Sequence, residues 1–75
     1  MPIREREQIV LTSDLPALGL KRGDIGTVVH VHPTGAGFEV EFMTLDGETI
    51  GVETLTADGV RPVAAHEIAH ARRVA

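Results

Sequence analysis

The sequence has 75 residues, no cysteine, and a net charge of −4 from 11 acidic and seven basic residues. A chain of this length folds as one small domain, and without cysteine it has neither disulfides nor thiolate metal sites. No stretch approaches the roughly 20 apolar residues that span a bilayer, and no signal segment opens the chain, so we expect a soluble cytoplasmic protein.

The first half of the chain predicts a strand, a long loop and a second strand. We expect the first strand from Gln8 to Thr12. Pro16, Gly19 and Gly23 mark the segment that follows as a loop of about ten residues, which is longer than the usual connection. A loop of that length is expected to be packed onto the domain or to have a function.

The second strand is expected over Ile25–His32, where β-branched residues are frequent. Alternation places Val29 and Val31 on its inner face and His30 and His32 on its outer face. A turn at residues 33–37 then predicts an antiparallel hairpin with the strand that follows.

Three further strands are predicted after this turn. In Phe38–Met43 the residues Phe38, Val40 and Phe42 point inward and Glu39 and Glu41 outward. The next strand, Thr49–Leu55, follows an Asp-Gly turn and is expected to point Ile50 and Val52 inward. Val60–Val63 is a last short strand, whose proline requires an edge or a terminal position.

These elements predict a mainly β fold with five short strands, closed as a small barrel over residues 1–63. The remaining residues, 64–75, form a C-terminal tail. Ala64–Val74 is the one helical candidate, because it is rich in alanine and ends in two arginines. A helix of about eleven residues is marginal in water, so we expect it to be ordered only if Ile68 and either an alanine or Val74 dock on the barrel.

The stretches LTSDLPALGLKRGDIGTVVHV, FEVEFMTLDGETIGVETL and VRPV resemble a small bacterial family catalogued as domain of unknown function 4926. The resemblance covers Arg6 to Val63. It implies an SH3-like β-barrel and no established activity or functional residue. The stretch GDIGTVV followed by FEVEF is also similar, more loosely, to SH3-like barrels of the KOW and nitrile hydratase beta-subunit types.

The tail spells the H-E-x-x-H signature of zinc proteases at His66-Glu67-Ile68-Ala69-His70. On a helix the two histidines share one face and converge on one zinc ion, with the glutamate as general base. No third ligand follows His70, whereas a catalytic zinc needs three protein ligands. We therefore expect no cofactor, and at most adventitious zinc, nickel or copper binding by His66 and His70.

A second pair of histidines, His30 and His32, is expected to lie beside Glu39 or Glu41 on the neighbouring strand. The simplest interpretation is a solvated polar face; the alternative is a surface metal site that uses both histidines. If the tail folds back over this face, all four histidines meet.

Missing residue types narrow the function further. There is no Trp and no Tyr, so no aromatic platform remains for stacking bases or gripping a Pro-rich peptide. No Ser/His/Asp or Cys/His set is evident. The leading hypothesis is a non-catalytic protein-binding or accessory module, such as an accessory subunit or an antitoxin-like or immunity-like partner.

This module is expected to bind another protein through an open sheet edge or through the long loop, and its sheet edges would also allow homo-oligomers. The candidate contact residues are in the loop: Leu15, Leu18, Leu20, Lys21 and Arg22. The leucines have the alternative role of capping the barrel. Two other functions stay open: a KOW-like nucleic-acid or ribosome-associated module, disfavoured by the net negative charge, and a metal-binding protein or metallohydrolase built on the tail motif.

Overall fold

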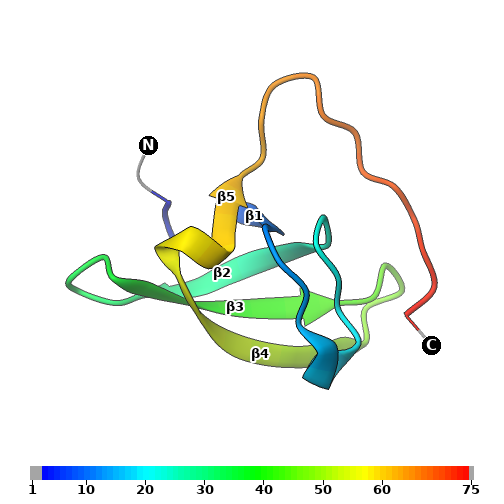
Figure 1. Cartoon of the computed structure of the whole chain (residues 1–75), viewed down its shortest axis with the longest axis horizontal. Coiled ribbons are helices and arrows are strands. Elements are labelled where there is room, and N and C mark those ends of the chain that lie inside the picture. The colour runs from blue at the N-terminus through cyan, green and yellow to red at the C-terminus, as the bar shows by residue number, and fades with distance from the viewer. Residues whose placement is uncertain (1–2, 75) are drawn as a thin grey trace.

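The fold is a single antiparallel sheet of five strands, seen in a computed structural model that describes residues 3–74 (Figure 1). Two short 3-10 turns interrupt the connections, and the described residues include no α-helix. The elements in chain order are β1 (Gln8–Leu11), η1 (Pro16–Leu18), β2 (Ile25–Val31), β3 (Gly37–Met43), β4 (Thr49–Thr56), η2 (Ala57–Gly59) and β5 (Val60–Pro62). The five predicted strands are thus confirmed, and each differs from its prediction by one residue at one end.

The strands are arranged in the order β4-β3-β2-β1-β5, so β1 lies between β2 and β5. Consecutive strands from β2 to β4 are hairpin neighbours, whereas the β1–β5 pair joins the two ends of the domain. The predicted closed barrel is wrong, because β4 and β5 are the two edges of the sheet and do not pair. β5 is only three residues long and ends in Pro62, which has no N–H to donate to a ladder.

The core lies on one face of this sheet. Its members come from all five strands and from the end of the long loop, and six further apolar side chains, Val74 of the tail among them, pack against it. No polar side chain is buried in the described part of the chain. The fully or nearly fully buried core residues are Ile9, Leu11, Leu20, Val28, Phe38, Val40, Phe42, Leu55 and Val60.

The β2–β3 hairpin carries a bulge that changes which valines face inward. Val28 pairs with Val40 and is fully buried, but the register shifts before His30 pairs with Glu39. Val29 therefore points to solvent and is 46% exposed. The prediction that Val29 faces inward is wrong because strict alternation does not hold across a bulge.

A second register shift follows Phe42, where β3 pairs with β4. It lets Ile50 pack against the core while Val52, opposite Glu41, is 52% exposed. The expectation for Ile50 is confirmed and that for Val52 is wrong. The inner face of β4 is completed by Gly51, against which the side chain of Leu18 packs from the long loop.

The predicted helix over Ala64–Val74 is wrong: this segment is a turn followed by an extended strand-free tail. Figure 1 shows the tail leaving β5, arching away from the sheet and returning toward the end of the molecule where the β3–β4 turn lies. Ile68, the large apolar residue on which helix docking depended, is 93% exposed. Polar contacts of the tail with the sheet and the loop replace the weak internal hydrogen bonds that so short a helix would make.

Within residues 3–74, no helix has the length and apolar character needed to cross a bilayer.

Candidate functional site

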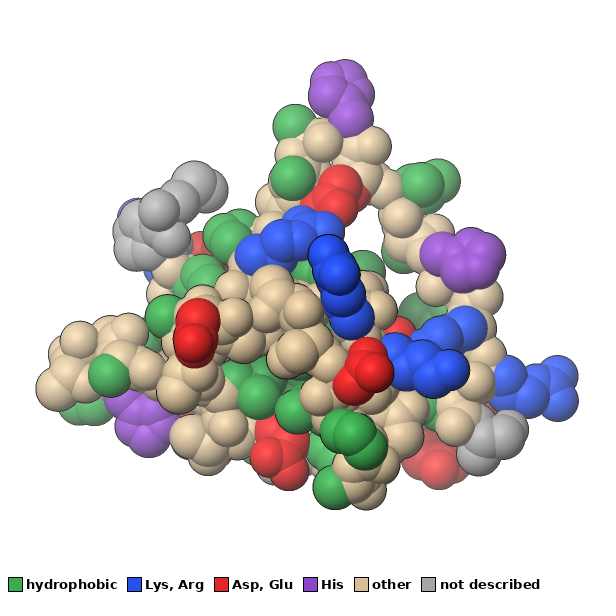
Figure 2. All heavy atoms as spheres, viewed as in Figure 1, with side chains coloured by type: hydrophobic (Ala, Val, Ile, Leu, Met, Phe, Trp, Pro, Cys, Tyr) green, Lys and Arg blue, Asp and Glu red, His purple; other side chains and the backbone are tan. Residues whose placement is uncertain are grey.

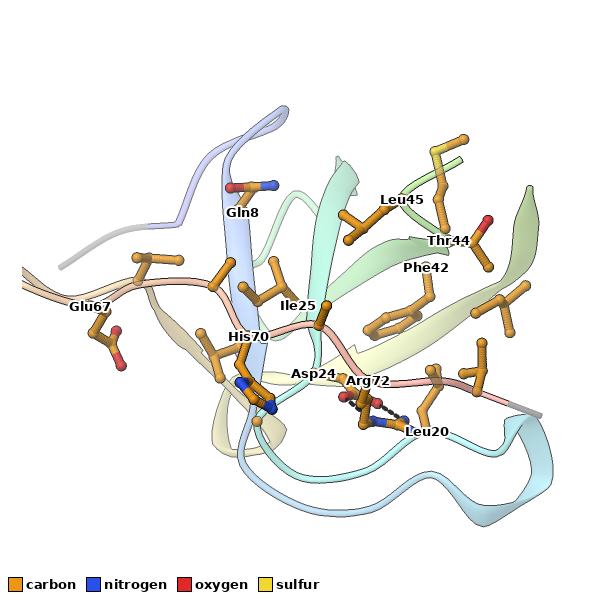
Figure 3. A pocket seen from close by; sticks show the side chains of 18 of the residues that line it. Gln8, Leu20, Asp24, Ile25, Phe42, Thr44, Leu45, Glu67, His70 and Arg72 are labelled. Atoms are coloured by element: carbon orange, nitrogen blue, oxygen red, sulfur yellow. Dashed lines mark hydrogen bonds and ion pairs between the residues drawn. The ribbon is translucent and has the colours of Figure 1, made fainter. Parts of the chain in front are cut away.

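A groove of about 830 Å³ lies between the tail and the sheet. Ile25 and Phe42 line it from β2 and β3, Leu45 from the β3–β4 turn, and Ile68 from the tail. In Figure 3 the tail runs past Ile25 and Phe42 from Glu67 to Arg72, and Figure 2 shows the opening that separates the tail from the body of the molecule. The volume falls within the range of about 300–1,000 Å³ that is typical of ligand-binding clefts.

The groove collects most of the exposed apolar side chains of the domain. Six large apolar side chains are exposed in the described residues: Val29, Met43, Leu45, Val52, Val63 and Ile68. Four of these six line the groove: Met43, Leu45, Val63 and Ile68. Leu45 and Ile68 are each 93% exposed, so they gain almost nothing from folding of the chain alone. Such a concentration is typical of an interaction surface.

The far end of the tail is fixed by Arg72, which forms a forked ion pair with Asp24 (Figure 3). Arg72 Nε donates to Asp24 Oδ1 at 2.8 Å, and Arg72 Nη2 donates both to Asp24 Oδ2 and, at 3.2 Å, to the carbonyl oxygen of Gly19. The backbone N–H of Lys21 also donates to Asp24 Oδ2, at 2.8 Å. The hydrogen bond from Arg72, assisted by that of Lys21, lowers the pKa of Asp24 against the opposing effect of its partial burial.

The near end of the tail is fixed by Glu67, the glutamate of the H-E-x-x-H motif. Its carboxylate accepts hydrogen bonds from Arg61 Nη1 at 2.8 Å, from Arg61 Nη2 at 2.7 Å and from the backbone N–H of Ala64 at 2.6 Å. The Arg61 bonds, followed by that of Ala64, lower the pKa of Glu67 to about 2. This glutamate serves the structure of the tail as the anion of an ion pair.

The other residues of the motif do not form the geometry that zinc proteases use. The segment is not helical, so His66 and His70 do not share a helix face, and both are exposed. His66 has a backbone φ of 64°, a left-handed conformation that no helix interior contains. The described residues hold no group of three His, Asp or Glu side chains placed to bind one metal ion.

The predicted outer-face histidines are found together on the β2–β3 hairpin, away from the tail. His32 Nε2 lies 2.8 Å from Glu39 Oε2, and the ring centroids of His30 and His32 are 5.4 Å apart. His30 Nδ1 lies 3.5 Å from Glu5 Oε2. The hydrogen bond with His32, followed by that from Thr54, lowers the pKa of Glu39. The expected cross-strand His and Glu pair is confirmed.

This outer face is acidic over a long stretch of chain. No Lys or Arg occurs from residue 25 to residue 60. The carboxylates there take neutral donors instead: Thr54 Oγ1 donates to both oxygens of Glu39 at 2.9 Å, and Thr49 Oγ1 donates to Glu41 at 3.1 Å. Apart from the histidine contacts, their negative charges are not compensated locally.

The three leucines predicted as partner contacts lie in the long loop between β1 and β2, which is folded onto the core. Leu20 is 4% exposed and belongs to the core, while Leu15 and Leu18 are half-buried against it. Leu15 and Leu20 form an isolated antiparallel bridge that closes the loop around Gly19, where φ is 71°. All three leucines therefore cover the core, which is the alternative role expected for them.

The two basic loop residues, Lys21 and Arg22, are exposed beside the groove. Their backbone is held by carboxylates, because the N–H of Arg22 donates to Asp14 Oδ1 at 2.8 Å just as that of Lys21 donates to Asp24. Within the described residues, neither side chain forms a salt bridge. They remain available to a partner at the Asp24 end of the groove.

Sequence reasoning missed the groove, because it depends on a tail that was expected to be helical. One feature of the sequence did point to this surface. Leu45 is an aliphatic residue within the otherwise polar turn at residues 44–48, where solvent exposure favours polar side chains. The pairing of Asp24 with Arg72, 48 residues apart, has no signature in the sequence.

A family model described as Domain of unknown function (DUF4926) matches residues 5–62 of the chain. No curated protein and no solved structure matches it. The matched range includes all five strands and ends before the tail and its histidine motif.

Proposed function

The chain belongs to the family of domain of unknown function 4926, and we propose that it is a non-catalytic SH3-like module that binds another protein. The strand order β4-β3-β2-β1-β5 and the 3-10 turn between β4 and β5 support the SH3-like part of this proposal. The binding surface is the groove between tail and sheet.

One observation carries the proposal: of the six large apolar side chains that are exposed among residues 3–74, four line this groove. Burying an aliphatic side chain of this size is worth about 1.5–3 kcal/mol, and such side chains are the usual anchors of an interface when a partner covers them. The occupant that fits is an apolar segment of a partner protein, because Ile25 and Phe42 line the groove together with the exposed apolar side chains. Two ion pairs, of Asp24 with Arg72 and of Glu67 with Arg61, hold the two ends of the tail.

The other two functions have less support. A nucleic-acid module would depend on the five basic residues outside the Arg61–Glu67 and Arg72–Asp24 ion pairs, which are Arg4, Arg6, Lys21, Arg22 and Arg73. The acidic face from residue 25 to residue 60 repels phosphate. A metallohydrolase would need Glu67 as general base, but its ion pair with Arg61 keeps it weakly basic.

The proposal is tested by capture from a cell lysate with two matched double variants. Leu45→Ser with Ile68→Ser removes the two most exposed groove side chains, and Val29→Ser with Val52→Ser removes the two exposed side chains that lie outside the groove. A partner that is retained by the wild-type chain and by the control variant, and lost with the groove variant, supports the proposal. Equal retention by both variants, or retention that depends on Val29 and Val52, contradicts it.

Homo-oligomers through the free edges of β4 and β5 remain part of the proposal. Sedimentation of the same variants distinguishes them from groove binding: association through an edge is unaffected by Leu45→Ser with Ile68→Ser, whereas self-association through the groove is lost.

A further inference from the structure

We propose that the tail is a strap that Arg72 fastens across the groove, and that releasing Arg72 from Asp24 opens the groove to a partner. This inference rests on the proposed function in one respect only, the identity of the groove as the binding surface. The motion of the strap can be measured without any partner.

The fastening is concentrated in one side chain. The guanidinium of Arg72 donates hydrogen bonds to the carboxylate of Asp24 and to the carbonyl oxygen of Gly19. These two residues are the first and last of the loop segment 19–24, which leads into β2. The same carboxylate holds the backbone of Lys21. Arg72 therefore joins the tail to the loop and also links two parts of the loop, Gly19 and Asp24, to each other. Loss of this one side chain is expected to loosen both the tail and the loop.

The remainder of the tail is held weakly. No backbone–backbone hydrogen bond joins residues 64–74 to the rest of the described chain. Residues 68–71, which lie between the two anchors Glu67 and Arg72, are exposed, and none of their side chains forms a hydrogen bond. Beyond Arg72, only Val74 packs against the core. A segment with so few contacts belongs to the least stable part of a domain, which opens long before the sheet unfolds.

The position of the strap determines whether a partner segment can enter the groove. Ala69 and Ala71 line it from the tail, opposite Ile25 and Leu45. With Arg72 fastened, a partner segment has to enter beneath the tail; with Arg72 released, the tail can turn away about its anchor at Glu67 and the groove becomes an open surface. If the competent state is the open one, the apparent affinity for the partner is reduced in proportion to the open fraction.

The strap is tested by measuring its distance from the sheet. Because the chain has no cysteine, Ala71→Cys and Glu48→Cys provide two unique sites for nitroxide labels, one on the tail and one on the β3–β4 turn. We expect a single narrow distance distribution in the otherwise wild-type chain and a broad, longer one when Arg72→Ala is added. Arg73→Ala is the matched control, since Arg73 is also an exposed arginine of the tail but forms no salt bridge in the described residues.

Hydrogen exchange gives a second readout that needs no labels. In the loop that Arg72 holds, the amide N–H of Leu20 donates to the carbonyl oxygen of Leu15, and that of Gly23 donates to the carbonyl oxygen of Leu11 at the end of β1. In Arg72→Ala we expect them to exchange about five- to tenfold faster, while the amide of Val40 in the interior strand β3 keeps its wild-type rate and reports that the sheet is intact. Asp24→Asn removes the charge from the other partner and is expected to release the strap as well.

The outcomes separate the two proposals. If Arg72→Ala leaves the label distances and the loop amides as they are in Arg73→Ala, the strap is overturned, whatever the groove binds. If Arg72→Ala opens the strap and the captured partner is retained more strongly, by the factor that the open fraction predicts, both proposals are supported. If the strap opens while capture does not depend on Leu45 and Ile68, the strap stands and the proposed function fails.

Discussion

The backbone of Gly26 packs directly against the aromatic ring of Phe42. A Cβ atom at Gly26 would lie 2.7 Å from Cε1 of Phe42 and 2.5 Å from Cγ1 of Val40, which is closer than real Cβ contacts come. Both neighbours are buried, Phe42 at 1% exposure and Val40 at 0%, so neither can move aside into solvent. The two-residue stretch Ile25-Gly26 at the start of β2 therefore needs a residue without a side chain at its second position.

Gly26→Ala is predicted to lower the free energy of unfolding by about 1–3 kcal/mol, the usual cost of forcing an extra carbon into a packed core. Urea unfolding followed by circular dichroism measures it. Gly59→Ala is the control, because a Cβ there would meet only Thr56 Oγ1 at 4.0 Å. Equal losses in the two variants would show that the cost comes from glycine replacement in general and contradict the packing argument.

Leu20→Ala is predicted to destabilise the fold although Leu20 belongs to a loop. Its side chain is 4% exposed and lies in the core, and removing a buried leucine side chain costs about 2–5 kcal/mol. Leu45→Ala, at a side chain that is 93% exposed, should change the unfolding free energy by no more than about 0.5 kcal/mol. The urea midpoints of the two variants show whether Leu20 caps the core or is a contact residue for a partner. A loss at Leu20 as small as that at Leu45 would contradict the capping role.

The pair of Glu39 with His32 predicts an acid-dependent part of the stability. The pKa of Glu39 is lower in the folded chain than its ordinary value of 4.5, first because of the hydrogen bond with His32 and then because of Thr54. Its stabilising contribution is therefore fully present above pH 4.5 and is lost as the pH falls through the lower, folded-state value. In Glu39→Gln, melting temperatures should fall less steeply with acid over this window.

The control for that measurement is Glu53→Gln, which removes one negative charge from the neighbouring strand β4 without touching the His32 network. It should keep the wild-type slope between pH 4.5 and the acid limit. If Glu39→Gln and Glu53→Gln behave alike, net charge rather than the His32 contact sets the acid dependence.

Glu67 is predicted to titrate with a pKa of about 2, because Arg61 and the backbone N–H of Ala64 bind its carboxylate. Carbon-13 NMR of the side-chain carboxyl measures this value directly. In Arg61→Met the pKa should rise toward the ordinary 4.5, whereas Arg73→Met should leave it unchanged. A wild-type value near 4.5 would mean that the tail is not anchored at Glu67.

Much of the sheet follows from local pattern. Phe38, Val40 and Phe42 alternate strictly with Glu39 and Glu41, and the structure has all five as predicted. The inner residues of β2 and β4 were harder, because each strand has a register shift, and a single extra residue moves every later side chain to the other face. Alternation alone cannot locate a bulge, which is why Val29 and Val52 were misplaced.

The tail could not be predicted for a different reason. Its composition favours a helix, and helix propensity depends on neighbouring residues in sequence. Its actual conformation depends on Arg72 meeting Asp24 and Val74 meeting the core, which are contacts over long sequence separations. The groove could not be predicted either, because seven of its 21 lining residues belong to the tail and no pattern within residues 64–74 reveals what they lie against.

The place of β1 in the sheet has a consequence for how the protein is made. β2, β3 and β4 are joined by short turns and can pair as soon as they are synthesised, but β1 must wait for its second neighbour, which ends at Pro62. Pairing between strands so distant in sequence closes slowly. On the ribosome, the apolar residues Ile9, Val10 and Leu11 therefore stay partly uncovered until nearly the whole domain has emerged, and this is the interval in which a nascent chain of this kind is most exposed to aggregation.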